Sequence, residues 1–438
     1  MSKQIAFIIV TLITLGVFTF TISRIISYFK MTKSAYPVSQ IGMRIKILLQ
    51  VAFGQTKILR KPVIGLMHAL VYWGFLVITI GTVEMIIDGL FSTERMLSPL
   101  GGFYDFVTAS GDIFAVIIII FCLAFLFRRH AIKVKRFSGI EMTKGSNIDA
   151  TIALSLITLL MVSLLGASVG YVAQNPTNYE GYFPVSAVLA PFLNVSDLHF
   201  FTEINWWAHV VLVYIFANVL PYSKHFHVFM SMPNVFLSRL EPLTKLRNME
   251  SVTKEVKMMM NPDTAFAPPP EGGEAPSRFG VKDVEDVNWK NYIDSLTCTE
   301  CGRCTSVCPA NITGKKLSPR KIFIDLRKRM NEKGPGLVKE GSGFSDNKAL
   351  LGDYVSAEEL WACTTCNACA MECPVNIDHP SLIVDMRRYL VLEESSAPTQ
   401  LNSMFTNIEN NGAPWPFAQS ARMDWAQNIE LKNNRPEK

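Results

Sequence analysis

The 438-residue sequence predicts an all-α membrane protein in two parts, a bundle of five transmembrane helices followed by a helical metal-binding module. Three observations lead to this fold class. Charged residues make up only 18% of the chain, against about 25% in soluble domains. Apolar residues concentrate in five long stretches of the first half, and eight of the nine cysteines form two copies of one ligand pattern. The net charge of +5 is too small and too localised for a nucleic-acid-binding protein.

The five stretches each reach the roughly 20 apolar residues that a helix needs to cross a bilayer. They lie at 5–28, 62–88, 111–128, 148–173 and 203–223. The first follows a single lysine and has no small-residue cleavage site, so we expect a retained span and not a signal peptide. Between the first two spans, residues 41–60 are expected to form an amphipathic helix along the membrane surface.

Basic residues in the short loops predict the orientation. The loops after spans one and three carry seven and six Lys or Arg residues, whereas the opposite loops, 89–110 and 174–202, carry only Arg95. We therefore expect the N-terminus outside and everything after span five in the cytoplasm. The predicted location is the cytoplasmic membrane of a bacterium or archaeon.

Three histidines in or near the spans are candidate axial ligands for haem, because neutral imidazole binds haem iron well. His68 lies near the cytoplasmic end of span two. His209 and His227 are 18 residues apart, which is five whole turns of one continuous helix, so both are expected on one face about 27 Å apart. His225 is expected to point to a different side. The alternative is a set of interfacial histidines that only form hydrogen bonds.

The stretch HVVLVYIFANVLPYSKHFH, residues 209–227, resembles the last span of the gamma subunit of respiratory nitrate reductase. The matching positions are Pro221, Tyr222, Ser223, Lys224 and His227. That family has two histidines ten residues apart on its second span, and here only His68 matches, because Ile78 occupies the other position. The resemblance implies a haem b held by His68 and His227, and leaves His209 as the candidate ligand of a second haem.

The composition changes between residues 232 and 285, where MMMNPDTAFAPPPEGGEAPSRFG is rich in proline, glycine and acidic residues. Such a segment is typical of a semi-rigid linker. The predicted organisation is therefore a membrane domain at 1–231, a linker at 232–285, a cysteine-rich domain at 286–395, and an extended tail at 396–438 that docks a partner.

The cysteine-rich domain contains C-x2-C-x2-C-x3-C-P twice. In two-cluster ferredoxins this spacing gives three ligands to one [4Fe–4S] cluster and the fourth to the other. The predicted ligand sets are Cys298, Cys301, Cys304 and Cys373 for one cluster, and Cys363, Cys366, Cys369 and Cys308 for the other. Structural zinc is the alternative for any C-x2-C pair, but zinc sites lack the trailing Cys-Pro.

Helical signals surround both motifs. Residues 318–333 begin with Ser-Pro and have amphipathic spacing, Ser356 and Glu359 form a capping box, and another helix begins at 379. This pattern resembles the α-helical ferredoxin type found in succinate dehydrogenase iron–sulfur subunits.

The two halves together resemble membrane iron–sulfur oxidoreductases related to the D and E polypeptides of heterodisulfide reductase. The resemblance rests on the membrane domain and on CTECGRCTSVCPANITGKKLSP and WACTTCNACAMECPVNIDHPSLIVDMRRYL. Fused members of the family continue into two cysteine-rich CCG modules, which are absent from this sequence. The resemblance therefore implies a separate CCG-domain iron–sulfur protein that docks near the tail.

The soluble half has no G-x-G-x-x-G, P-loop or G-x-S-x-G motif, and no catalytic residue is predicted. We expect an electron-transfer subunit of a quinone-linked respiratory oxidoreductase, which passes electrons between the CCG partner and the quinone pool. An electron-transfer flavoprotein or a flavin dehydrogenase is the expected donor by family analogy. The alternatives are a membrane ferredoxin-type assembly factor and a redox sensor.

Overall fold

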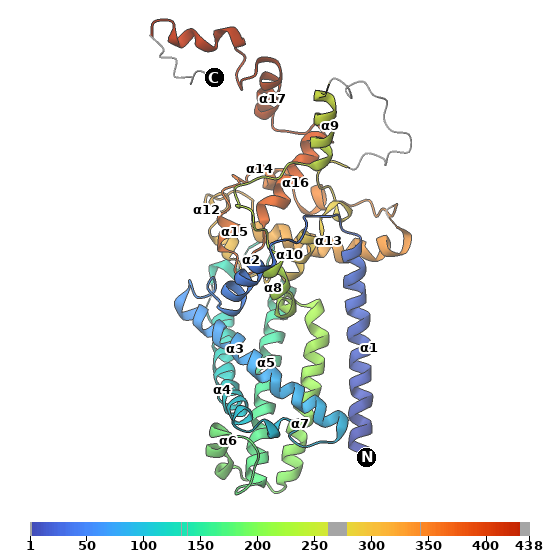
Figure 1. Cartoon of the computed structure of the whole chain (residues 1–438), viewed down its shortest axis with the longest axis vertical. Helices are drawn as coiled ribbons and strands as arrows, with labels where there is room; N and C mark the ends of the chain where they lie inside the picture. Colours follow the sequence, from blue (N-terminus) through green and yellow to red (C-terminus); the bar gives the residue numbers. More distant parts are fainter. Residues whose placement is uncertain (1, 133, 138, 262–277, 342, 430–438) are drawn as a thin grey trace.

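The computed structural model describes residues 2–132, 134–137, 139–261, 278–341 and 343–429. The structure is 70% helical, and no strand occurs among the described residues. Five long apolar helices form a bundle, and the cysteine-rich module lies at one end of it (Figure 1). The predicted all-α fold class is confirmed.

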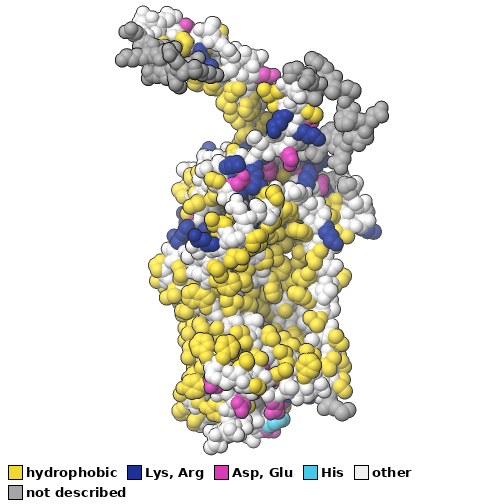
Figure 2. All heavy atoms as spheres, in the orientation of Figure 1, with side chains coloured by type: hydrophobic (Ala, Val, Ile, Leu, Met, Phe, Trp, Pro, Cys, Tyr) yellow, Lys and Arg dark blue, Asp and Glu magenta, His cyan; other side chains and the backbone are white. Residues whose placement is uncertain are grey.

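The five helices that are long and apolar enough to cross a membrane correspond to the five predicted spans. They are α1 (Ser2–Lys30), α3 (Pro62–Phe91), α4 (Gly102–His130), α5 (Lys144–Gln174) and α7 (Leu198–Val219). A broad apolar belt covers this part of the surface, and Lys and Arg side chains gather where the belt meets the cysteine-rich module (Figure 2). This distribution is the one expected of a membrane protein.

Close packing between α5 and α7 depends on two glycines. A Cβ atom on Gly166 would lie 2.3 Å from Asn205 Oδ1, and one on Gly170 would lie 2.3 Å from Thr202 Oγ1. Small residues at a helix interface let two membrane helices approach closely, which compensates for the missing hydrophobic driving force in lipid. Helix α5 also packs against α4, and α4 against α3. Helix α1 stands at the edge of this group (Figure 1).

The last span does not continue as one helix to His227. Helix α7 ends at Val219, and two 3-10 turns, Leu220–Tyr222 and Lys224–Phe226, precede α8 (His227–Phe236). Pro221 has no N–H to donate, and Ser223 accepts a hydrogen bond from the N–H of His225, so the chain turns at this point. The five-turn spacing argument for His209 and His227 assumed a continuous helix and is therefore wrong.

The segment between the first two spans packs against α8. It consists of α2 (Ile41–Ile47) and a π-helical turn (Leu48–Phe53). Arg44 is buried and donates to the carbonyl oxygens of Phe236 and Ser238, both at 2.9 Å. Residues 41–53 of the predicted 41–60 helix are thus helical, whereas 54–61 form bends and turns. Through Arg44 the segment is fixed to the chain that leaves the bundle.

The cysteine-rich module is built from short helices around two longer ones. These are α10 (Trp289–Thr297), α11 (Arg303–Ser306), α12 (Pro309–Ile312), α13 (Pro319–Glu340), α14 (Ala357–Trp361), α15 (Ala368–Glu372) and α16 (His379–Leu392). Ser318 caps α13, and Ser356 and Glu359 form the predicted capping box of α14. The module's core contains fully buried Phe323, Leu326, Leu382 and Met386.

Smaller elements complete the described chain. They are η2 (Ser98–Leu100), η3 (Lys135–Phe137), α6 (Pro184–Leu189), η4 (Ala190–Phe192), η7 (Val284–Asp286), a π-type turn (Leu350–Tyr354) and η9 (Gln419–Ala426). The expected linker contains a helix, α9 (Glu250–Met260), and the expected extended tail contains α17 (Thr399–Asn411). Residues 262–277 of the linker and 430–438 of the tail lie outside the described range.

Candidate functional site

The two cysteine motifs have the same local geometry. In the first motif Glu300 and Gly302 have positive φ angles, of 56° and 73°, and in the second the equivalent residues Thr365 and Asn367 have φ of 54° and 61°. A short helix follows each turn and carries the third cysteine of its motif. Glycine is needed at position 302, because a Cβ there would lie 2.6 Å from the carbonyl oxygen of Arg136.

The fold brings the eight cysteines together in two groups. Cys308 lines a small pocket with Cys363, Cys366 and Cys369, all three from the second motif. We call these four the outer set, because it includes the exposed Cys366. The remaining four, Cys298, Cys301, Cys304 and Cys373, we call the inner set. Each group thus combines three cysteines of one motif with the last cysteine of the other.

Thiols of the inner set are close enough to affect one another. Burial raises the pKa of Cys373 to about 12, and the neighbouring Cys301 and Cys298 contribute to this rise. Burial also raises the pKa of Cys298 to about 11. Burial raises the pKa of Cys304 as well. These three buried thiols resist ionisation, so they become thiolates only when a bound metal compensates the charge.

The grouping of the cysteines fits iron–sulfur clusters. In two-cluster ferredoxins each cluster takes three cysteines of one motif and the last cysteine of the other. The outer set has this composition, since Cys308 of the first motif lies with Cys363, Cys366 and Cys369 of the second. The residues present therefore fit two [4Fe–4S] clusters.

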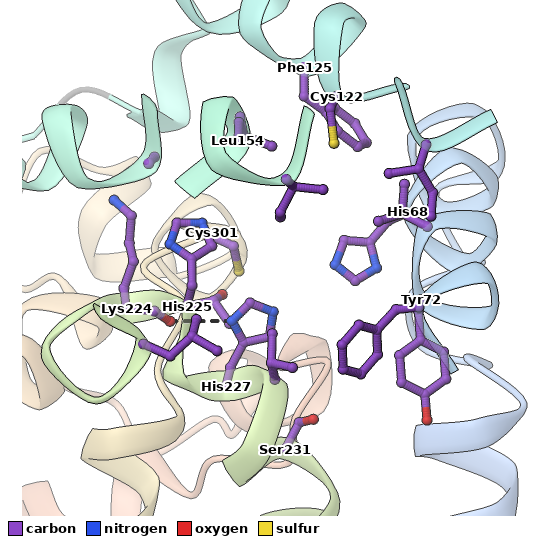
Figure 3. Close-up of a pocket in the computed structure, with 18 of the residues that line it drawn as sticks. His68, Tyr72, Cys122, Phe125, Leu154, Lys224, His225, His227, Ser231 and Cys301 are labelled. Carbon is purple, nitrogen blue, oxygen red and sulfur yellow. Dashed lines mark hydrogen bonds between the residues drawn. The ribbon is translucent and has the colours of Figure 1, made fainter. Parts of the chain in front are cut away.

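A cavity of about 540 Å³ lies in the bundle at its junction with the cysteine-rich module. His68 on α3 faces His225 and His227 across it, and Cys301 of the inner set lies close by (Figure 3). His209, on α7, lines the same cavity, as does Ile78. The cavity therefore brings together all three predicted haem-ligand candidates and one predicted cluster ligand.

Hydrogen bonds leave ring nitrogens of these histidines available. His227 Nδ1 lies 3.2 Å from the carbonyl oxygen of Lys224, and His209 Nδ1 lies 2.9 Å from that of Leu160. A carbonyl oxygen only accepts, so each Nδ1 carries the proton and each Nε2 keeps a lone pair. His209 Nε2 and His68 Nδ1 are buried and have no hydrogen-bond partner among the residues that the structure describes. Burial, with the nearby His225, lowers the pKa of His227 to about 3, so its imidazole is neutral.

The prediction that His225 points away from His227 is wrong. Their ring centroids are 6.0 Å apart, and both line the cavity. The error arose because the prediction used the 100° step of an α-helix, whereas residues 224–226 form a 3-10 turn. His225 Nδ1 lies 2.9 Å from Ser223 Oγ and 3.7 Å from Asp149. Pro221 followed by Ser223 was the sequence signal for this turn.

The two basic loops, which predicted the orientation, also contact the cysteine-rich module. Lys57 Nζ donates to the carbonyl oxygen of Cys373 at 3.1 Å, and Arg60 donates to that of Met371 at 3.2 Å. In the loop after span three, Glu141 forms a buried ion pair with Arg320 at 2.7 Å. Sequence reasoning missed these roles, because loop charge alone does not reveal a partner more than 150 residues away.

The five apolar helices and the paired cysteine motifs define a membrane protein of the iron–sulfur redox class. Residues 297–377 match the family described as "4Fe-4S dicluster domain". The chain is related to iron–sulfur oxidoreductases and to components of heterodisulfide reductase, which supports an electron-transfer role.

Two relatives are similar along nearly the whole chain. A probable iron-sulfur-binding oxidoreductase, FadF, of Bacillus subtilis is 28% identical over 97% of the chain and 61% of the relative. The EtfAB:quinone oxidoreductase of Syntrophomonas wolfei is 28% identical over 95% of the chain and 58% of the relative. The chain thus spans about three fifths of the length of these two relatives.

A third relative is similar over a shorter segment. A probable membrane-anchored ferredoxin of Chromohalobacter salexigens is 32% identical over 36% of the chain and 26% of its own length. No solved structure matches the chain significantly.

Proposed function

We propose that this protein is the membrane electron-transfer subunit of a quinone-linked oxidoreductase complex, and that it uses two [4Fe–4S] clusters and haem b. The observation that carries the proposal is the shared cavity, which is lined by His68, His227 and the inner-set Cys301. A cluster site next to a histidine-lined cavity allows electrons to pass between the soluble module and the membrane. When bound, these groups supply one-electron transfer, which no side chain in this chain provides.

The inner and outer cysteine sets would each hold one cluster. The exchanged fourth cysteine, Cys308 with the second motif and Cys373 with the first, supports this assignment. His68 and His227 would hold the haem, since His227 is neutral and its Nδ1 is fixed by the Lys224 carbonyl oxygen. His209 is the candidate ligand if a second haem binds, and its Nε2, which has no hydrogen-bond partner among the described residues, is consistent with that role.

The proposed orientation places the N-terminus outside and the cysteine-rich domain in the cytoplasm of a bacterial or archaeal cell. It rests on the thirteen basic residues of the two inner loops against one in the outer loops. The proposed domains are the membrane domain at 1–231, the linker at 232–285, the cluster domain at 286–395 and the tail at 396–438.

The proposed partners are a CCG-domain iron–sulfur protein and the quinone pool, with an electron-transfer flavoprotein or flavin dehydrogenase as donor. The name of the Syntrophomonas relative combines EtfAB with quinone and supports this pairing by analogy. In the tail, Trp415, Phe417 and Trp425 are exposed, and aromatic residues are enriched at protein interfaces. The tail is therefore the proposed docking segment.

The test is a reduced-minus-oxidised visible spectrum of the detergent-purified full chain, with haem and non-haem iron quantified. We expect a b-type signal from about one haem, and about eight non-haem irons per chain. His68→Ala should lose that haem and keep the irons. His130→Ala is the control, because His130 is exposed and its ring nitrogen pairs with Thr151 outside the cavity.

Other outcomes would change the proposal. Two haems would mean that His209 has a partner as well. Full iron without any haem in the wild-type chain would contradict the quinone-linked function and favour an assembly factor.

A further inference from the structure

Fixed cations are distributed unequally around the two cysteine sets. Near the inner set, Lys57 Nζ donates to the carbonyl oxygen of Cys373 at 3.1 Å, and Arg327 donates to that of Cys298 at 3.0 Å. Arg303, a buried residue next to Cys304 in sequence, donates to the carbonyl oxygen of Lys57 at 3.1 Å. Three cations therefore lie along the backbone that carries the inner cysteines.

Two acidic residues lie next to the inner set. Glu372, the residue before Cys373, is partly exposed, so solvent screens its charge. The other is already paired. Glu300, the residue before Cys301, accepts hydrogen bonds from Arg327 at 2.5 Å and from Lys224 at 3.3 Å. Because Glu300 has two cationic partners, it does not cancel the charge of Lys57 and Arg303. The inner set is also shielded from water, since Cys298, Cys304 and Cys373 are all buried.

In the described part of the chain, fewer unpaired fixed cations lie near the outer set. Among the described residues, Arg387 is the cation that donates to its backbone, at the carbonyl oxygen of Cys363. Nearby Lys321 is paired with Asp325 and Glu359, so it adds little net charge. Cys366 is exposed, so solvent screens charges near this set more strongly.

Reduction makes a cluster more negative by one charge, so a nearby fixed cation favours the reduced state and raises the reduction potential. The effect is larger where burial keeps water away. We propose that Lys57, together with Arg303, holds the reduction potential of the inner cluster above that of the outer one. This inference rests on the proposed ligand sets. It gives Lys57 an electrostatic role, in which its charge favours the reduced state of the inner cluster.

The consequence is a preferred direction of electron transfer, from the outer cluster to the inner one. With clusters held by the two cysteine sets, a single electron would pass from the outer set to the inner set, with no bond formed or broken. The initial electron comes from a soluble one-electron donor of flavoprotein or iron–sulfur type. Since Lys57 belongs to the membrane half, docking of the two halves itself makes the inner cluster the preferred acceptor.

The test is an EPR-monitored redox titration of the full-length protein in detergent. Lys57→Gln should lower the midpoint potential of one cluster, the one with the higher potential in the wild type, and leave the other unchanged. Lys57→Arg should retain the wild-type value. Lys61→Gln is the matched control, because this exposed lysine lies on the same loop. Arg387→Gln should lower the potential of the other cluster.

Two results would overturn the inference. In one, Lys57→Gln changes neither potential although about eight irons are bound. In the other, it shifts the cluster of lower potential. Wild-type protein that binds no more than about half of these irons would instead contradict the proposed two-cluster function itself, so the two failures are distinguishable.

Discussion

The buried ion pair between Glu141 and Arg320 connects the membrane bundle to the cysteine-rich module. Its removal tests directly how these two halves are held together. Arg320 Nε and Nη2 lie 2.8 and 2.7 Å from Glu141 Oε1, and Ser318 Oγ donates to the same oxygen at 2.6 Å. The Arg320 side chain is 1% exposed and that of Glu141 is 3% exposed. Arg320 also donates to the carbonyl oxygens of Arg136 and Glu300.

Glu141→Gln removes the negative charge and keeps the shape of the side chain. Breaking a buried pair from one side costs about 3–5 kcal/mol, because an uncompensated charge stays buried. The amide oxygen still accepts one hydrogen bond, so we expect the lower end, about 3 kcal/mol. Since about 1.4 kcal/mol is a factor of ten in an equilibrium constant, separation of the halves at this contact should increase about 100-fold.

Hydrogen–deuterium exchange in detergent measures this change. Backbone amides near residue 141 and at the start of α13 should lose protection in Glu141→Gln, while amides within α5 stay as in the wild type. The control is Lys316→Ala, which removes an ion pair to Glu358 whose partners are 65% and 63% exposed. Such a pair contributes at most about 1 kcal/mol. Equal protection in Glu141→Gln and wild type would refute the reasoning.

Three further predictions concern the cluster module. Cys308→Ala should halve the iron content to about four per chain and remove the EPR signal of the outer cluster, although Cys308 belongs to the first motif; loss of the inner signal would contradict the exchanged pairing. Gly302→Ala should weaken cluster retention, measured by the rate of iron loss to a chelator, because the new Cβ meets the Arg136 carbonyl oxygen at a positive φ; an unchanged rate would argue against the tight turn. Burial alone would raise the pKa of Glu141, but the hydrogen bond from Ser318 and the charge of Arg320 hold that pKa below its usual value. The contact should therefore be constant between about pH 8 and 5 and weaken as the pH falls below about 4. Weakening already near pH 6 would contradict a lowered pKa.

Most of the fold could be predicted from local sequence signals. The five spans follow from apolar length, and Ser318, Ser356 and Glu359 mark the starts of α13 and α14 because capping needs only neighbours in sequence. The last span was the exception. We expected one continuous helix from His209 to His227, whereas Pro221 ends the regular hydrogen-bond ladder before His227.

The site was only partly predictable, because some of its contacts join residues far apart in the sequence. The cysteine spacing specifies a cluster motif, because three ligands lie within seven residues of one another and their geometry is local. The role of Lys57 depends on Cys373, a contact across 316 residues, and that of Glu141 depends on Arg320 across 179 residues. No local pattern encodes such pairs.

The sequence by itself determined the class of protein, because membrane insertion and cluster binding depend on hydrophobic length and ligand spacing along the chain. Only the tertiary structure decided which charges surround the inner cysteine set and which histidines share the cavity. These features depend on how the two halves pack, and packing is fixed by contacts between residues far apart in sequence.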